Sequence, residues 1–304
     1  MDTRPITPVR LAQSVIAVPP LARNQQQHVD REQNTRIIRH LESGGVNTLL
    51  YGGNANFYHI RPSEYADTLQ MLAEAAAPGT LVVPSAGPAY GLSLDQAVIL
   101  HDFDFPTVMI LPHTGLNTST GVETGIRRFA ELYGKPVVLY IKAEGYITTE
   151  GAAGLVADGL ISWIKYAIVR QNPSEDPFLS ELIQLVGGEI VVSGIGEQPA
   201  ITHLRDFSCN GFTSGCVCVA PALSQRMLRA IKTGDWAEAE AIRETFKPLE
   251  DLRNAINPVR VLHEAVSLAG VADTGEILPL LSGLEEDQRA AVASTALALR
   301  AATV

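Results

Sequence analysis

Short hydrophobic runs alternate with longer amphipathic stretches over the first two-thirds of the chain. Most of the short runs are apolar throughout, which is typical of parallel strands buried on both faces. They predict strands at residues 14–18, 46–51, 80–84, 107–111, 137–140, 161–165, 190–193 and 211–216. The amphipathic stretches predict helices at residues 30–42, 62–75, 93–101, 120–132, 149–158, 177–186, 199–207 and 221–231. Strands and helices in this order predict a (β/α)8 TIM barrel.

The pattern changes after about residue 222, where the predicted strands end and helical periodicity continues. Helices are expected at residues 236–253, 259–268 and 285–301, interrupted by Pro258 and a glycine-containing loop at 270–275. We therefore predict two domains. Residues 1–222 form the barrel that carries the active site, and residues 223–304 form a helical C-terminal domain.

The charge balance argues against several kinds of partner. The formal net charge is −10, and no run of lysine or arginine is present, so neither nucleic acid nor an anionic membrane is expected. The longest apolar runs, such as residues 137–141, are too short to cross a bilayer. The first residues lack the hydrophobic segment of a signal peptide, so the expectation is a cytoplasmic protein.

Cysteine and glycine spacing argue against a disulfide framework and a dinucleotide site. The three cysteines, Cys209, Cys216 and Cys218, are an odd number without zinc-site spacing. We expect Cys216 and Cys218 to lie on one face of the last strand as buried thiols. Gly194-Ile195-Gly196 follows a predicted strand, but it lacks the third glycine and the acidic partner of a dinucleotide fingerprint.

Lysine is rare in this chain, so each lysine can be considered separately. In a TIM barrel the active site lies at the C-terminal ends of the strands. Lys135 precedes a predicted strand, and Lys232 and Lys247 fall in the helical C-terminal region. Only Lys142 and Lys165 lie at or just past strand ends. Lys165 stands in a largely apolar strand, where burial would lower its pKa and make the amine nucleophilic; the alternative is a side chain that reaches solvent at the rim.

Other side chains and a glycine turn could complete a site around Lys165. Tyr140 ends the preceding strand and could relay protons, or it could be an ordinary rim tyrosine. Lys142 follows Tyr140 by two residues and could depress the pKa of Lys165, bind a substrate carboxylate or be the nucleophile itself. Backbone N–H groups at Gly52, Gly53 and Asn54 could bind a carboxylate, although a plain tight turn explains them equally well. Thr213 in the last strand is a weaker candidate for the pocket lining.

The order of elements resembles the dihydrodipicolinate synthase / N-acetylneuraminate lyase family of class I aldolases over nearly the whole chain. Residues 136–140 resemble the strand that ends in the family's Y-N-x-P tyrosine, and residues 161–165 resemble its strand ending in the Schiff-base lysine. Residues 52–56 occupy the place of its carboxylate-binding G-T-T-G-E loop. Residues 233–239 and 257–260 are similar to two segments of its C-terminal domain.

Several positions depart from the family's pattern. The loop threonines are replaced by Gly53 and Asn54, and the loop glutamate is replaced by Asn56. The residue two positions past the motif tyrosine is Lys142, and the arginine that follows in the family is missing at residues 144–146. The tyrosine pair after the fourth strand reads His113-Thr114. A synthase of lysine biosynthesis is therefore not expected. The resemblance implies a lyase, aldolase or dehydratase, that forms an imine between Lys165 and a 2-oxo acid. The imine itself is the electron sink, so no metal or organic cofactor is expected, and the resemblance also implies a homotetramer.

Two other classes stay open at this stage. One is a non-catalytic barrel that binds a keto acid or sugar acid as a sensor. The other is a metal-dependent barrel enzyme that uses His113, Glu144 and Glu197 as ligands.

Overall fold

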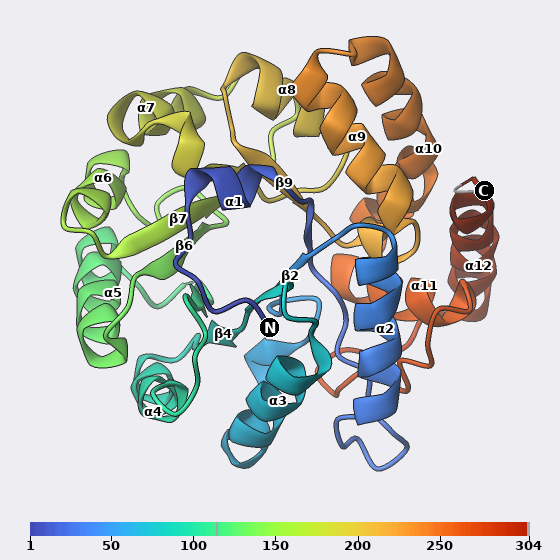
Figure 1. Cartoon of the computed structure of the whole chain (residues 1–304), viewed down its shortest axis with the longest axis horizontal. Helices are drawn as coiled ribbons and strands as arrows, with labels where there is room; N and C mark the ends of the chain where they lie inside the picture. Colours follow the sequence, from blue (N-terminus) through green and yellow to red (C-terminus); the bar gives the residue numbers. More distant parts are fainter. Residues whose placement is uncertain (114, 303–304) are drawn as a thin grey trace.

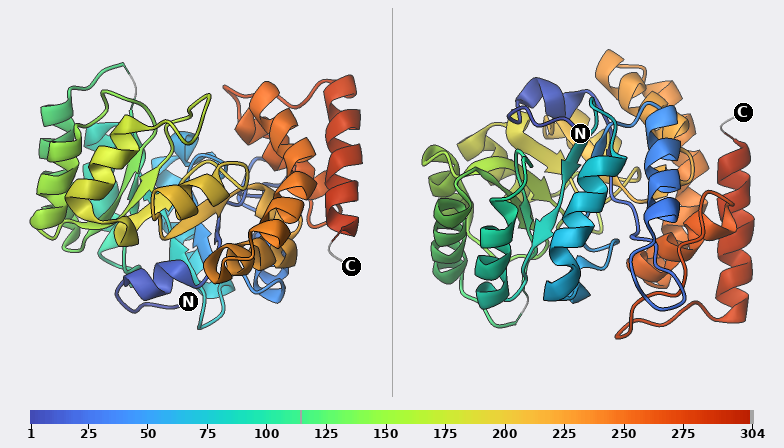
Figure 2. Two further views of the ribbon diagram at one scale, coloured as in Figure 1. Left: turned by 90° about the horizontal axis from the view of Figure 1, so that it is seen from above. Right: turned by 60° about the horizontal axis from the view of Figure 1, so that its bottom comes forward.

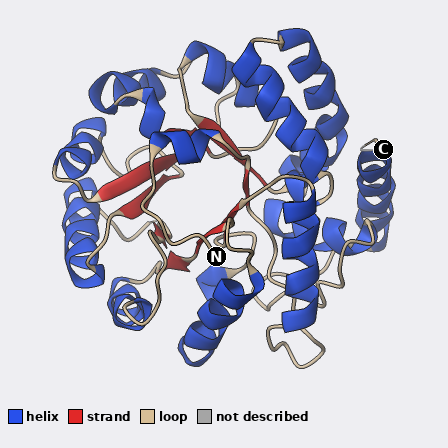
Figure 3. Ribbon diagram, in the orientation of Figure 1, coloured by secondary structure: helices blue, strands red, loops and turns tan. Residues whose placement is uncertain are grey.

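A computed structural model describes residues 1–113 and 115–302 of the chain. Parallel strands form a ring at its centre, and helices surround the ring (Figures 1 and 3). The strands are β1 (Ile16–Ala17), β2 (Thr48–Leu50), β3 (Leu81–Val83), β4 (Ser85–Ala86), β5 (Met109–Ile110), β6 (Val137–Ile141), β7 (Ile161–Tyr166), β8 (Val191–Ser193) and β9 (Gly211–Ser214). The hydrogen-bonded order is β3-β2-β1-β9-β8-β7-β6-β5-β4. The predicted TIM barrel is confirmed.

One predicted strand, residues 80–84, is present as two pieces because proline interrupts it. Pro84 has no backbone N–H to donate, and it separates β3 from β4. β3 pairs with β2, whereas β4 pairs with β5, and the Pro84 carbonyl still accepts a hydrogen bond from the Met109 N–H at 2.8 Å. Both ends of the hydrogen-bonded order therefore belong to one stretch of chain, and the sheet closes on itself.

The helices follow the expected order. They are α1 (Pro8–Ala12), α2 (Arg31–Ser43), α3 (Pro62–Ala75), α4 (Tyr90–Leu100), α5 (Ser119–Tyr133), α6 (Thr149–Ala157), α7 (Pro177–Val186), α8 (Ala200–Asp206), α9 (Pro221–Thr233), α10 (Trp236–Ala255), α11 (Pro258–Leu268) and α12 (Glu286–Ala301). Side chains of Asp30, Asp176 and Asp235 cap the starts of α2, α7 and α10.

Two local expectations were wrong, and one short helix was not predicted. α1 was not predicted, because a single turn carries too little periodicity to detect. α4 begins at Tyr90, three residues before the predicted start at residue 93, so Ser93 lies inside the first turn and its hydroxyl donates to the Tyr90 carbonyl. The last strand ends at Ser214, and Cys216–Cys218 form a 3₁₀ turn rather than one face of a strand. All three cysteines are nevertheless buried and unpaired by disulfides.

The C-terminal helices pack against one side of the barrel (Figure 2). α10 lies beside α9 and also contacts α8, α11 and α12. The domain boundary at residues 222/223 stays a prediction, and α9 spans it while packing against α2 and α8 of the barrel wall. No helix in the described part of the chain is long and apolar enough to cross a membrane.

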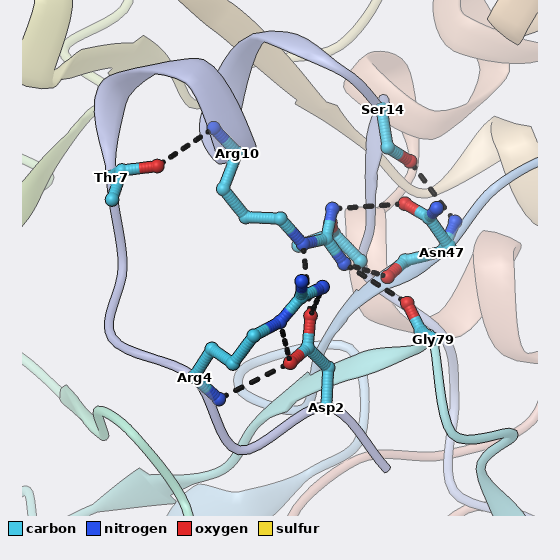
Figure 4. A network of polar contacts seen from close by, with 8 residues as sticks. Asp2, Arg4, Thr7, Arg10, Ser14, Asn47 and Gly79 are labelled. Atoms are coloured by element: carbon cyan, nitrogen blue, oxygen red, sulfur yellow. Dashed lines mark hydrogen bonds and ion pairs between the residues drawn. The ribbon is translucent and has the colours of Figure 1, made fainter.

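Polar contacts close the end of the barrel at which the strands begin (Figure 4). Arg10 of α1 donates to the side chain of Asn47 at 3.0 Å and to its carbonyl at 2.7 Å. Asp2 accepts from Arg4 at 2.8 Å and lies 3.5 Å from the Arg10 guanidinium. These contacts hold the N-terminal segment against the loops that enter β2 and β3.

Candidate active site

Lys165 and Tyr140 lie side by side near the C-terminal ends of adjacent strands. β6 and β7 are parallel neighbours, and Tyr140 is the direct register partner of Lys165. The Lys165 Nζ lies 4.3 Å from the centre of the Tyr140 ring. The structure thus brings together the two side chains that the sequence predicted as catalytic, at the face of the barrel where such sites occur.

The Lys165 amine is buried without a counter-ion. The residue is 4% exposed, and no carboxylate or hydrogen-bond acceptor contacts its Nζ among the residues that the structure describes. Burial disfavours the ammonium form and lowers the pKa of Lys165 to about 7, and the nearby charges of Lys142 and Arg253 lower it further in the same direction. A large share of this side chain is therefore a neutral amine at neutral pH.

Tyr140 remains a proton donor over the same pH range. It is 9% exposed, and burial raises the pKa of its phenol to about 12, opposed in part by the charge of Arg253. A neutral phenol beside a neutral amine can donate a proton to an oxygen that leaves from the carbon to which the amine has bonded.

Lys142 lies just past β6 and is exposed to solvent. Its charge still contributes to the lowered pKa of Lys165, so the two amines are near each other. An exposed lysine gains no desolvation of its own. This makes Lys142 a weaker nucleophile than Lys165.

The loop after β2 has backbone N–H groups that are available to a ligand. No hydrogen-bond acceptor within the described residues engages the N–H groups of Gly52, Gly53 or Asn54. A Cβ at Gly52 would lie 2.5 Å from the Met109 Cε, so only glycine fits there without a shift. The Asn54 side chain is already engaged, because its Nδ2 donates to the Val18 carbonyl at 3.0 Å.

Thr213 lies in β9 as the register partner of Ile16 and is 2% exposed. Lys165 pairs with Val192, and Val192 pairs with Gly211, so Thr213 stands two residues beyond the level of Lys165 along the barrel. No contact between Thr213 and Lys165 appears among the described residues, and its role in binding stays a prediction.

Sequence reasoning did not anticipate a polar cluster between the turn after β8 and helix α10. Glu197 is fully buried and accepts hydrogen bonds from the hydroxyls of Ser214 at 2.8 Å and Ser224 at 2.7 Å. Glu250 of α10 is also fully buried and accepts from the N–H groups of residues 197 and 198 at 3.0 and 2.8 Å. Burial raises the pKa of both carboxyls, and Arg253, one helical turn beyond Glu250, lies beside them.

The ligands proposed for a metal-dependent enzyme are not gathered into one site. Glu144 forms an exposed ion pair with Arg170, and Glu197 is held by the two serines. No group of three or more His, Cys, Asp or Glu side chains in residues 1–113 and 115–302 is arranged to hold a metal ion. Thr114, which with His113 replaces the family's tyrosine pair, lies outside the described residues.

Comparisons with known proteins show what this chain is similar to. The model of the "Dihydrodipicolinate synthetase family" matches residues 182–299. A "Probable 5-dehydro-4-deoxyglucarate dehydratase" of Rhizobium meliloti (strain 1021) is 26% identical over 281 residues, covering 83% of this chain and 88% of that protein. A "Probable 5-dehydro-4-deoxyglucarate dehydratase 1" of Streptomyces coelicolor is 23% identical over 261 residues, covering 83% of this chain and 82% of that protein.

Solved structures show the same fold. Dihydrodipicolinate synthase from Bacillus clausii superposes with a TM-score of 0.84 at 21% identity, covering 94% of this chain and 97% of that one. The sialic acid aldolase of Ruminococcus gnavus gives a TM-score of 0.83 at 13% identity, covering 96% and 98%. The fold of these solved structures agrees with the resemblance predicted from residues 52–56, 136–140 and 161–165, and the family model matches the C-terminal part of the chain.

Proposed function

We propose that this chain, a divergent member of the dihydrodipicolinate synthetase family, is a lyase that acts on a sugar-derived 2-oxo acid through a Schiff base on Lys165. The observation that carries the proposal is the Lys165 amine itself. It is buried, has no counter-ion in the described residues, has a pKa lowered to about 7, and lies against the Tyr140 ring. Burying an unpaired lysine is costly, and a nucleophile that must be neutral gives a reason for that cost.

The reaction begins with attack of the neutral Lys165 amine on the C2 carbonyl of the 2-oxo acid. The resulting carbinolamine loses its hydroxyl as water after a proton is delivered, and Tyr140 is the phenol placed to deliver it. The protonated imine then draws electrons from C2. The Tyr140 phenolate left by that proton transfer takes a proton from C3, which forms an enamine. In a dehydratase the phenol returns this proton to the C4 hydroxyl, which leaves as water. In an aldolase the C3–C4 bond breaks instead, and in both cases hydrolysis releases the product and the amine.

The substrate carboxylate, which is attached to C2, needs hydrogen-bond donors near the imine. We propose the N–H groups of Gly52, Gly53 and Asn54, which have no acceptor in the described chain. Oriented backbone N–H groups bind an anion without the desolvation cost of another charged side chain. Thr213 and Lys142 complete the proposed binding set.

Dehydration is the branch to test first, because the curated relatives carry the names of dehydratases. We further propose that the enzyme is cytoplasmic. It works without metal or organic cofactor and as a homotetramer, as the family resemblance implies. Activity that survives exhaustive chelation and a tetramer mass by light scattering are the expected results. Activity lost with EDTA and restored by a divalent ion would contradict the cofactor proposal.

Borohydride trapping with pyruvate tests the proposed chemistry directly. The protein should gain one reduced pyruvyl group on the peptide that contains residues 161–165, and Lys165→Arg should abolish the adduct because arginine stays protonated. Lys135→Arg is the matched control, since the Lys135 Nζ donates to the Phe105 carbonyl at the opposite end of the barrel. An adduct on Lys142 would move the nucleophile to β6, and absence of any adduct would favour a sensor that binds without reacting.

A further inference from the structure

The turn that follows β8 lies between Lys165 and a second buried cation. A Cβ placed on Gly194 would lie 3.0 Å from the Lys165 Cγ. A Cβ placed on Gly196, two residues later, would lie 3.2 Å from the Arg253 Nη1. Two residues of chain span no more than about 7 Å, so the Lys165 side chain and the Arg253 guanidinium flank the same short segment.

Glycine at 196 allows helix α10 to reach this turn. Gly196 has φ +112°, and a Cβ there would lie 1.9 Å from the Glu250 Oε1, so no other residue fits without a shift. The Glu250 carboxylate accepts the N–H groups of Glu197 and Gln198, and an Arg253 N–H donates to the Ile195 carbonyl at 2.7 Å. These contacts place a C-terminal side chain at the mouth of the barrel in a fixed position.

The Arg253 guanidinium keeps donor capacity in this position. Its Nη2 bonds Ile195 and Asn254, and its Nε bonds Asn254. Its Nη1 lies 3.9 Å from the Glu250 Oε1, beyond hydrogen-bonding distance, and has no closer acceptor in the part of the chain that is described. The guanidinium is therefore held by its other nitrogens, and an N–H group remains for a ligand.

We propose that Arg253 binds a second carboxylate at the far end of the substrate, and that it selects 2-oxo diacids over 2-oxo acids with a neutral end. The inference rests on the proposed function, because Lys165 fixes C2 of the substrate. In a five- or six-carbon diacid, three or four bonds of about 1.5 Å separate C2 from the distal carboxylate carbon, a span of the same order as the segment of at most about 7 Å that Lys165 and Arg253 flank. A guanidinium is the side chain best matched to a carboxylate by geometry.

Lys142 is the other cation near Lys165, so it is the alternative candidate for binding the distal carboxylate. It is exposed, so solvent competes with any ligand for its ammonium group, whereas Arg253 is 9% exposed. A buried, pre-positioned donor loses less entropy on binding and acts in a lower dielectric. The structure therefore favours Arg253 as the group that selects the distal carboxylate, and the charge of Lys142, besides its proposed part in binding, helps to keep Lys165 neutral.

The experiment compares two ligands of equal chain length, 2-oxoglutarate and 2-oxopentanoate, which differ only in a carboxylate and a methyl group at the far end. Their dissociation constants are measured by calorimetry on the full chain. The wild type should prefer 2-oxoglutarate. Arg253→Met should raise the dissociation constant of 2-oxoglutarate about 10- to 100-fold, as expected for loss of one charge-assisted pair. The dissociation constant of 2-oxopentanoate should stay almost unchanged. Arg253→Lys should keep part of the preference.

Arg243→Met is the matched control, because Arg243 also lies on α10 and its guanidinium pairs with Glu240 and Glu244 at the surface. Pyruvate trapping shows that each variant keeps a folded site, since pyruvate has no distal carboxylate. Equal weakening of both ligands by Arg253→Met, or a preference lost only in Lys142→Met, would overturn the assignment. Failure of the wild type to form any pyruvate adduct would instead contradict the Schiff-base proposal, and it leaves the calorimetric comparison valid for Arg253.

Discussion

At the end of the barrel where the strands begin, buried charge is paired. The Asp2 carboxylate lies between Arg4 and Arg10, and hydrogen bonds from Arg4 hold the pKa of Asp2 well below its usual range. At the end where the strands finish, the buried Lys165 faces Lys142 and Arg253, two charges of its own sign, and its pKa falls. The first arrangement is what stability favours, and the second is what an amine nucleophile needs. Paired charge therefore stabilises one end of the barrel, and the unpaired amine at the other end supports the chemistry proposed there.

The largest expected effect is at Lys165. Lys165→Met should abolish turnover and the pyruvate adduct, because no other lysine in the described chain is buried at the barrel mouth. It should also stabilise the fold. The folded pKa of about 7 lies below the unfolded 10.5, so the unfolded state binds more protons between these values and wild-type stability rises with pH across that window. Below the folded pKa the cost is complete and amounts to about 5 kcal/mol.

Urea unfolding of the wild type and of Lys165→Met at pH 7 and pH 10 measures the free energy of unfolding of each. The difference in this free energy between the variant and the wild type should be smaller at the higher pH. A variant that is less stable than the wild type at pH 7 would mean that the Lys165 ammonium is paired in solution.

Tyr140→Phe should have the next largest effect. The variant loses only the phenolic oxygen, so the fold should survive while kcat falls by about 10²–10⁴, the usual range for a positioned acid–base group. Single-turnover assays of imine formation and of product formation would show which proton transfer is lost. Unchanged turnover would make Tyr140 a packing residue for the Lys165 side chain.

Arg10→Met tests the opposite end of the barrel. The substitution removes donors to Asn47, Thr48 and Gly79 and leaves Asp2 with one fewer cation. The free energy of unfolding should drop by about 2–4 kcal/mol, while kcat/KM stays within about twofold of the wild type at 25 °C. A loss of activity larger than the loss of folded protein would show that the two ends are coupled.

The smallest effect is expected at Lys142. Lys142→Met removes an exposed positive charge, so the pKa of Lys165 should rise by less than about one unit and the acidic limb of the pH–kcat/KM profile should move upward. An unmoved profile with a higher KM for a diacid alone would identify Lys142 as a carboxylate ligand. A variant that changes neither would remove Lys142 from the site.

The proximity of the two candidate catalytic side chains could be predicted from the sequence better than the side chains around them. Tyr140 and Lys165 end consecutive strands, and consecutive strands of a parallel barrel are neighbours, so their proximity follows from the chain order. The place of the β2-loop glycines at the C-terminal end of a strand could likewise be predicted from the chain order. Lys142 was placed correctly near Lys165, but its exposure could not be read from its position in the chain.

Glu250 and Arg253 could not be predicted in the same way. They stand at i and i+3 on an amphipathic helix, where such a pair normally indicates an exposed ion pair. Their burial depends on how α10 packs against the turn after β8, and that packing depends on Gly196, far away in the sequence. In the sequence, Gly194-Ile195-Gly196 resembles only an incomplete nucleotide motif. In the structure, Gly194 allows the close approach of Lys165 and Gly196 allows that of Glu250.

The most direct test of the account is the pH dependence of adduct formation at Lys165. The initial rate of pyruvate trapping on the peptide containing residues 161–165 is measured by mass spectrometry, with cyanoborohydride in excess and with the intrinsic pH dependence of the reductant corrected on a model amine. A buried amine surrounded by like charges should react with a half-maximal rate near pH 7, the pKa to which burial lowers it. A rate that rises only above pH 10, as for an ordinary exposed lysine, would contradict the account.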